Sequence, residues 1–447
     1  MTDTVQQSRA ATRWLISILL AITLEGGLRK WILPPWLHPV AYASKDILAL
    51  AFVIHHSRLS SKILTDLRDR VLLITLLLLP CFLLGLTWSP TAAVMNFKNA
   101  VLWPLFAIYM AVSFDWSALS KVTRALNILV FAMAVLGFIQ FNSPIDAPIN
   151  RYAWHVMGRM EPIATFGASA GVRATGTFSY ISGYSTFASF AFLWMIWRLL
   201  NAQTLAERAF SSLGALSGLV CALTSGSRSP LYQCFLGLAM AIAVSQIRRK
   251  LRILALLGVV IACYCTFSKE QLFMSFYQRF TEAGDSTSQR IAGAGLEFVR
   301  LALQHPFGVG MGQESNVSDY RIAEQQAAIE FIEDGRSRMA IEGGWLAILA
   351  QMITLGIFIS IAIRAWRTQN DQARIAAAAI TPAATYLLTN CLWYDHNGSA
   401  LWWFFIGACL SVTLRAAETP MRPKLPTTSP SYAAGNPQSS VWQSEFV

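Results

Sequence analysis

A polar segment, Thr224 to Pro230, separates two apolar runs of the chain and carries Arg228 near its centre. A guanidinium close to the hydrocarbon of a bilayer costs roughly 2.5–3.5 kcal/mol on insertion scales, so it is retained where it meets an anion or a water-filled cavity. The position of Arg228 therefore predicts a protein that binds a negatively charged group at or inside a membrane.

Three further arginines lie beside small or hydroxylated residues: Arg173, Arg290 and Arg338. The guanidinium fork binds phosphate oxygens in pairs, and nearby hydroxyls and glycine N–H groups complete such a site. Each charge-assisted hydrogen bond contributes about 1.5–3 kcal/mol, so three or four of them offset the desolvation of a diphosphate. We expect these arginines and Arg228 to bind a diphosphate. The alternative is that each one marks the membrane interface and extends toward lipid headgroups.

Three side chains are candidates for the acid or base of a reaction: Glu342, His305 and Asp395. Glu342 follows Arg338 by four positions, so both share a helical face if the helix begins early enough, and an ion pair is the alternative. His305 precedes Pro306 and a run of glycines, where it also suits the end of a helix. Asp395 lies in a short turn between two apolar runs, and an ordinary turn residue is the alternative. The spacing of acidic, histidine and cysteine residues indicates no metal site, and we expect no metal or other cofactor.

The composition places these residues in a membrane protein. Of the 447 residues, 55% are hydrophobic and only 13% are charged. The apolar residues form blocks long enough to cross a bilayer of about 30 Å. We predict an all-α polytopic membrane protein of about twelve transmembrane helices, in a single domain over residues 1–415. The expected spans are 13–33, 42–56, 71–88, 93–114, 122–141, 181–200, 210–224, 229–246, 251–267, 342–363, 375–393 and 400–414.

The basic residues indicate how these spans are oriented. Short cytoplasmic loops of membrane proteins accumulate Lys and Arg, and alternate loops of this chain are basic if both termini are cytoplasmic. Topology therefore accounts for the net charge of +11, and we expect no nucleic-acid partner. The same orientation places two long polar segments outside, 142–180 and 268–341, the second with short helices. The tail 416–447 is rich in Pro, Ser and Thr, which predicts a disordered cytoplasmic segment.

Five segments carry a resemblance to a known family: residues 25–34, 173–179, 224–230, 290–312 and 342–356. In this order they resemble the O-antigen ligase and O-antigen polymerase-like membrane glycosyltransferases. The resemblance implies a C-type glycosyltransferase fold that acts at the periplasmic face of a bacterial inner membrane, with 268–341 as the large periplasmic loop.

The resemblance also implies the reaction. Such proteins transfer a glycan from an undecaprenyl diphosphate carrier to an acceptor sugar, without nucleotide sugar or an obligatory metal. The implied partners are this lipid-linked donor, a glycan acceptor and membrane lipids, with polysaccharide export or chain-length proteins as further partners. By position, Arg173 and Arg228 match the family's diphosphate-binding arginines, and Arg290 and Arg338 match its loop arginines. Glu342 is then the first candidate for the base that deprotonates the acceptor, ahead of His305 and Asp395.

One departure from the family pattern bears on the type of transfer. Ligases typically carry a His-Asn pair just before the span that follows the large loop, where this chain runs from Arg338 to Glu342. We therefore expect a polymerase of repeat units for an exopolysaccharide or surface polysaccharide, with an O-antigen ligase as the alternative. A transporter of polysaccharide or lipid-linked oligosaccharide also suits Arg228, and a non-enzymatic scaffold is a third class. The long outer loop favours an enzyme, because loops of that size usually have a function.

Overall fold

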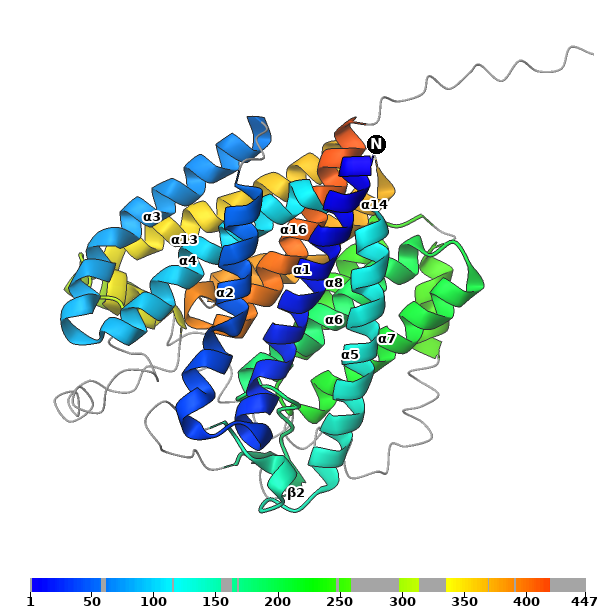
Figure 1. Cartoon of the computed structure of the whole chain (residues 1–447), viewed down its shortest axis with the longest axis horizontal. Helices are drawn as coiled ribbons and strands as arrows, with labels where there is room; N and C mark the ends of the chain where they lie inside the picture. Colours follow the sequence, from blue (N-terminus) through cyan, green and yellow to red (C-terminus); the bar gives the residue numbers. More distant parts are fainter. Residues whose placement is uncertain are drawn as a thin grey trace, which may run out of the picture.

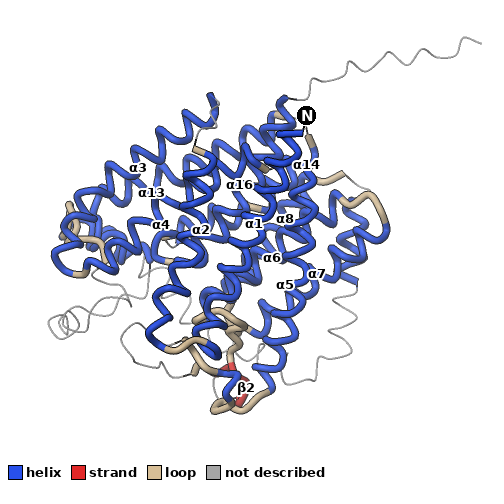
Figure 2. The backbone as a smooth tube through the Cα atoms, viewed as in Figure 1, coloured by secondary structure: helices blue, strands red, loops and turns tan. Residues whose placement is uncertain are grey.

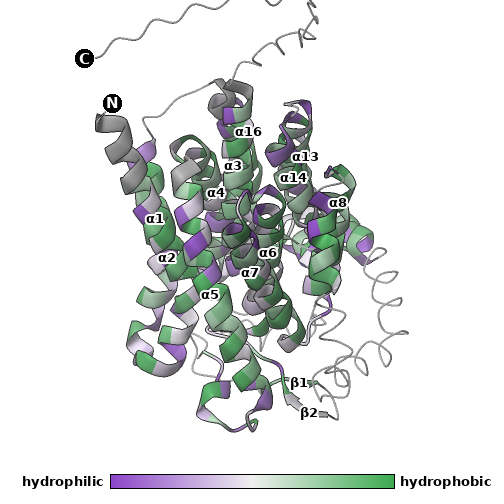
Figure 3. Ribbon diagram, turned by 90° about the vertical axis from the view of Figure 1, so that its right-hand side faces the viewer, coloured by the Kyte–Doolittle hydropathy of each residue, from purple (hydrophilic) through white to green (hydrophobic). Residues whose placement is uncertain are grey.

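The computed structural model describes residues 2–57, 62–114, 116–153, 163–166, 169–246, 249–258, 297–312, 335–368, 370–389 and 391–418 of the chain. Within them, long helices pack side by side in a bundle (Figures 1 and 2). Hydrophobic residues cover most of the length of these helices (Figure 3).

The elements follow one another in the order that the apolar runs predict. The first half of the chain contains α1 (Thr2–Gly27), η1 (Leu28–Ile32), η2 (Pro35–Leu37), α2 (His38–His56), α3 (Lys62–Trp88), α4 (Pro90–Ser113), α5 (Trp116–Asn142), η3 (Pro148–Asn150), β1 (Thr165–Phe166) and β2 (Ser169–Val172). The second half contains α6 (Ile181–Asn201), α7 (Leu205–Thr224), α8 (Ser229–Val244), α13 (Gly335–Arg367), α14 (Asp371–Ala379), α15 (Thr381–Thr389), η4 (Leu392–Tyr394) and α16 (His396–Glu418). Residues 249–258 and 297–304 are also helical.

Six of the described helical segments are long and apolar enough to cross a membrane: Ala10–Ile32, Pro35–His56, Thr65–Trp88, Ala118–Asn142, Gly335–Arg367 and His396–Ala416. The described part of the chain is therefore consistent with the predicted all-α membrane protein. The total of about twelve spans stays a prediction. The C-terminal part of the predicted span 251–267 lies outside the described residues, as do the predicted loop segment 268–296 and most of the tail.

Three details differ from the sequence expectations. Residues 375–393 form no single span: α14 ends at Ala379 and α15 begins at Thr381, because Pro382 has no backbone N–H to continue the helical ladder. The helix expected from residue 342 begins earlier, at Gly335, so the end of the predicted outer loop belongs to α13. The outer segment 142–180 contains a two-stranded antiparallel hairpin, β1 with β2, which the all-α prediction did not include.

Close helix packing forms the interior of the bundle. α16 packs against α4 and α6, and α6 packs against α7. A Cβ on Gly407 would lie 3.0 Å from the carbonyl of Ala107, so the absence of a side chain lets α16 approach the backbone of α4. Aromatic rings fill the space between α6 and α16, where Trp194 and Phe405 have centroids 5.2 Å apart. Dispersion between such closely packed groups holds helices together in lipid, where apolar burial alone gives little gain.

The two ends of the bundle carry different elements. The start of α1 and the end of α16 lie at one end, and the β1–β2 hairpin lies at the other (Figure 1). We call the second one the loop end, and among the described residues it holds 28–37, 142–153, 163–166, 169–180, 225–228, 305–312 and 391–395. Both termini therefore leave the helices on the same side, as expected, and the assignment of that side to the cytoplasm stays a prediction.

Candidate functional site

Arg173 lies against the turn between α7 and α8. Its Nε donates to the carbonyl of Ser225 at 3.1 Å, and Nη2 donates to Oγ of Ser227 at 2.8 Å. The next residue, Ala174, donates its N–H to the carbonyl of Thr224 at 2.9 Å. Gly226 has φ of +61°, a conformation open to glycine, and this lets the turn close around the arginine. The structure therefore brings together two polar segments that the sequence separates by more than fifty residues.

Arg228 belongs to the same turn. It is the N-cap residue of α8 and is partly exposed, and its carbonyl accepts the N–H groups of Leu231 and Tyr232, both at 3.1 Å. Pro230 occupies the first turn, where its missing N–H has no helical partner to lose. Since Arg173 binds the residue directly before Arg228, two of the four predicted arginines meet at one turn.

The backbone of residues 175–176, two positions after Arg173, is held by side chains from η1 and α5. Nζ of Lys30 donates to Oγ1 of Thr175 at 2.6 Å and to the carbonyl of Gly176 at 3.1 Å. Oε1 of Gln140 accepts the N–H groups of Thr175 and Gly176 at 3.1 and 2.8 Å. Both anchors are buried, with Lys30 6% and Gln140 1% exposed. The position of Arg173 therefore depends on a fixed backbone and not on a mobile loop.

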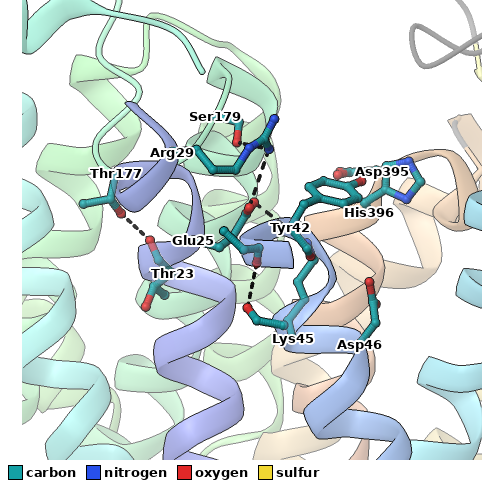
Figure 4. Close-up of polar contacts among 12 residues, drawn as sticks. Thr23, Glu25, Arg29, Tyr42, Lys45, Asp46, Thr177, Ser179, Asp395 and His396 are labelled. Atoms are coloured by element: carbon teal, nitrogen blue, oxygen red, sulfur yellow. Dashed lines mark hydrogen bonds and ion pairs between the residues drawn. The ribbon is translucent and has the colours of Figure 1, made fainter. Parts of the chain in front are cut away.

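The rest of this loop packs directly on the end of α1. Nη1 of Arg29 donates to Oγ of Ser179 at 3.1 Å, and the hydroxyl of Thr177 bonds the carbonyl of Thr23 (Figure 4). A Cβ on Gly26 would lie 2.4 Å from the backbone nitrogen of Ser179, so only glycine allows this approach. The helix continues as a π-helical turn, η1, a form that is frequent at functional sites.

A buried charge network lies behind this loop, between α1, α2 and α4. Glu25 faces two cations, with Nη1 of Arg29 3.6 Å from Oε2 and Nζ of Lys45 3.8 Å from Oε1 (Figure 4). Lys98 pairs with Asp46 at 2.6 Å. Lys45 is 0% and Glu25 1% exposed. Ionisable residues within apolar helices are expensive unless paired and usually mark a functional site.

Tyr42 and His396 connect this network to α16. The guanidinium of Arg29 and Nζ of Lys45 lie 5.2 and 3.9 Å from the centroid of the Tyr42 ring, within range of cation–π attraction. The Tyr42 and His396 rings meet edge to face at 5.7 Å. His396 also contacts the side-chain amide of Asn99, next to Lys98.

Glu342 lies at a second cluster on α13. Because this helix begins at Gly335, Arg338 and Glu342 share a face, and Nε of Arg338 lies 3.6 Å from Oε1 of the carboxylate. The other oxygen, Oε2, accepts the backbone N–H of Gly312 at 2.8 Å. The Arg338 guanidinium lies 5.0 Å from the centroid of the Tyr394 ring. Burial raises the pKa of Tyr394, and the charge of Glu342 raises it further.

The glycine-rich segment 305–312 docks on α13 and α3. Val309 and Gly310 donate their N–H groups to the carbonyls of Ile341 and Glu342 at 2.8 and 3.0 Å. Gly308, Gly310 and Gly312 all have positive φ, and so does Gly344 in α13. A Cβ on Gly344 would lie 2.3 Å from the carbonyl of Pro306. The helical geometry of α13 is interrupted at Gly344, and these glycines allow the backbone of 305–312 to pack closely there. This packing brings the N–H of Gly312 to Glu342.

The other two acid–base candidates occupy helix ends. His305 follows the helix 297–304, and its own N–H still bonds the carbonyl of Leu301 at 2.9 Å. Asp395 is the residue before α16, and Oδ1 accepts the N–H of Gly398 at 2.9 Å, which is a helix N-cap. Its Oδ2 accepts from the hydroxyls of Tyr386 and Thr186 at 3.2 and 3.3 Å. Burial raises the pKa of Asp395, and these hydrogen bonds offset only part of that increase.

Arg290, the fourth predicted arginine, lies outside the described residues. The described part of the chain holds no group of three or more His, Cys, Asp or Glu side chains that could hold a metal ion. Metal independence itself stays a prediction.

Five residues of the charge network and its loop contacts were not among the candidates chosen from the sequence: Tyr42, Lys45, Asp46, Lys98 and Gln140. Glu25, Arg29 and Lys30 entered only within a segment that resembles the family. Seven of these eight, all but Tyr42, carry a visible signal, since they are ionisable or strongly polar residues inside predicted spans.

Together, the fold and these contacts define a membrane protein of many helices with a buried polar site at one end of its bundle. Residues 213–352 match the protein-family model described as O-Antigen ligase, so this part of the chain is similar to that family. The matched segment includes Arg228, Arg338 and Glu342, whereas Arg173 and the α1–α2–α4 charge network lie outside it. No curated protein matches the chain.

Proposed function

We propose that this protein is a polymerase that joins undecaprenyl-diphosphate-linked oligosaccharide repeat units into an exopolysaccharide or surface polysaccharide, at the periplasmic face of a bacterial inner membrane. The O-antigen ligase-like match supports a membrane glycosyltransferase acting on a lipid-linked glycan and an acceptor. The absence of a His-Asn pair before Glu342 favours repeat-unit polymerisation over ligation.

The observation that carries the proposal is the meeting of Arg173 and Arg228 at the turn between α7 and α8. Nε and Nη2 of Arg173 donate hydrogen bonds to Ser225 and Ser227, and these bonds orient its guanidinium before any ligand binds. Two guanidinium groups that cannot lose their charge suit a diphosphate whose negative charge grows as it departs. Arg338 and Arg290 complete the diphosphate site in this proposal.

Glu342 is the proposed base. In the reaction, an acceptor hydroxyl oxygen attacks the anomeric carbon of the donor and forms the new glycosidic bond. The bond from that carbon to the diphosphate oxygen breaks, and its electron pair leaves with undecaprenyl diphosphate. The hydroxyl proton passes to the carboxylate of Glu342, which is buried beside Arg338. His305 and Asp395 rank behind it because both lie at helix ends, where a capping role accounts for them.

An O-antigen ligase is the second candidate, since the matched family carries that description. Deleting the gene and analysing carrier-linked glycans together with polymer length separates the two functions. We expect single repeat units to accumulate on the lipid carrier. Full-length polymer left on the carrier would instead indicate a ligase. Unchanged carrier-linked glycans would contradict both and favour a transporter or a bystander.

A further inference from the structure

An apolar groove lies far from the loop end, between α13 and the pair α14 and α15. Its volume is about 310 Å³. Phe358, Ile363 and Trp366 of α13 line one wall, and Ala377, Ile380 and Ala384 line the wall opposite.

The sequence explains why this space is not filled. The α14 face consists largely of alanines, whose short side chains leave space beside α13 even though the two helices pack together, and the chain breaks at Ile380 before Pro382. On the α13 side, Ile363 and Trp366 are 46% and 55% exposed. The groove therefore opens to the apolar surroundings of the bundle, and its occupant must be apolar.

Positive charge lies at one end of the groove. Arg374 on α14 places its guanidinium 5.6 Å from the centroid of the Trp366 ring, and its Nε donates to the carbonyl of Trp366 at 3.1 Å. Arg367 follows Trp366 directly and is exposed. A ligand lying in the groove would therefore place its end beside two arginines.

The acidic residues nearby do not cancel this charge. Asp66 is already bound by Arg364 at 3.0 Å and by Arg70 at 3.5 Å. Asp371, at the start of α14, is bound by Arg249 at 3.1 Å. The arginines at this end outnumber the two carboxylates, so the end of the groove favours an anion.

We propose that this groove binds one acyl chain of an anionic phospholipid, with the lipid phosphate held by Arg367 and Arg374. The apolar walls exclude inorganic phosphate as the ligand. A zwitterionic lipid would also bring a phosphate, but its own cationic group would then lie beside the arginine pair and oppose binding. Basic pockets between helices are recognised sites for anionic headgroups, and guanidinium binds phosphate oxygens in pairs. The site is separate from the proposed catalytic end and does not rest on the proposed reaction.

The test compares the thermal unfolding of the full chain in nanodiscs of phosphatidylcholine alone and of phosphatidylcholine with phosphatidylglycerol. We expect phosphatidylglycerol to raise the Tm of the wild type, by on the order of 3 °C. The double variant Arg367→Ala/Arg374→Ala and the groove-filling variant Ala384→Leu should each lose most of this increment. Lys121→Ala removes an exposed charge at the same end of the bundle, on α5, and should keep it.

The increment is measured within each variant, so a lower absolute Tm does not obscure the result. An equal increment in all variants would overturn the proposal, because general surface attraction would then account for it. An increment that survives in Ala384→Leu alone would also overturn it, since binding would not need the groove.

Discussion

The backbone N–H of Gly312 donates to Oε2 of Glu342 at 2.8 Å, although thirty positions separate the two residues. The other oxygen, Oε1, faces Arg338 at 3.6 Å. The Tyr394 hydroxyl also bonds this carboxylate, so backbone, guanidinium and phenol together fix its position. Under the proposed function, the same carboxylate takes the acceptor's proton while Arg338 stabilises the charge of the diphosphate.

Glu342→Gln tests this role. Glutamine keeps a carbonyl oxygen for Gly312 but cannot take a proton, so we expect polymer formation to fall by about 10²–10⁴-fold while the protein still folds. Conversion of lipid-linked repeat units in isolated membranes measures the effect. Glu297→Gln is the matched control, because Glu297 pairs with Arg300 at an exposed position. Normal polymer formation by Glu342→Gln would show that Glu342 is an ion-pair partner of Arg338 and not the base.

Arginine-to-lysine changes test the diphosphate site. Arg173 uses two different nitrogens for Ser225 and Ser227, and a single ammonium cannot make both bonds in that geometry. We expect Arg173→Lys and Arg228→Lys each to lose about tenfold or more of the activity, with the protein still reaching the membrane. Arg300→Lys, at a mostly exposed position, should keep full activity. Near-normal polymer from Arg228→Lys would contradict the assignment.

Helices and contacts within one helix could be predicted from the sequence, whereas contacts between different helices could not. The apolar runs predicted the helices, and the four-residue spacing of Arg338 and Glu342 predicted their shared face, because both follow from local periodicity. The contact of Arg173 with Ser227 depends on which helix ends meet in space, which periodicity does not contain. The same holds for Glu25 and Lys45: each is visible as a charge in an apolar run, but their pairing depends on how α1 packs against α2.

The close packing of Gly26 against the backbone of Ser179 predicts that a substitution at Gly26 reduces activity, although Gly26 lies far from the arginines in sequence. Gly26→Ala would place Cβ 2.4 Å from the backbone nitrogen of Ser179 and should displace the loop that carries Arg173, with loss of most activity. Gly356→Ala is the control, since a Cβ there meets nothing within 4 Å and alanine favours a helix by about 1 kcal/mol. Polymer synthesis and thermal unfolding of both variants give the comparison. Full activity in Gly26→Ala would show that the loop need not stay in this position.

The buried network predicts a non-additive effect on stability. Glu25→Gln removes the carboxylate that Arg29 and Lys45 both face, and an uncompensated buried charge costs about 3–5 kcal/mol. Adding Lys45→Met removes one of the two cations and should recover part of that loss. Thermal unfolding in detergent of the wild type, both single variants and the double variant measures the coupling. Strictly additive effects would argue against direct interaction between Glu25 and Lys45.

Asp395 offers a test that separates a cap from a catalyst. Asp395→Asn retains an oxygen for the N–H of Gly398 and should keep both folding and activity. Asp395→Ala should lose about 1 kcal/mol of stability with the cap, and more because Tyr386 and Thr186 lose their acceptor. Measuring unfolding and polymer synthesis for both variants distinguishes the roles. A stable but inactive Asp395→Asn protein would make Asp395, and not Glu342, the stronger candidate for the base.

The pairing of Glu25 with Lys45 has a consequence for biogenesis. A nascent α1 with its continuation η1, entering the bilayer alone, would carry Glu25 and Arg29 into hydrocarbon, and α2 alone would carry Lys45 and Asp46. Each isolated charge opposes partitioning from the translocon by roughly 2.5–3.5 kcal/mol. Leaving the translocon together as a helical hairpin, α1 and α2 would neutralise part of that charge before lipid surrounds them.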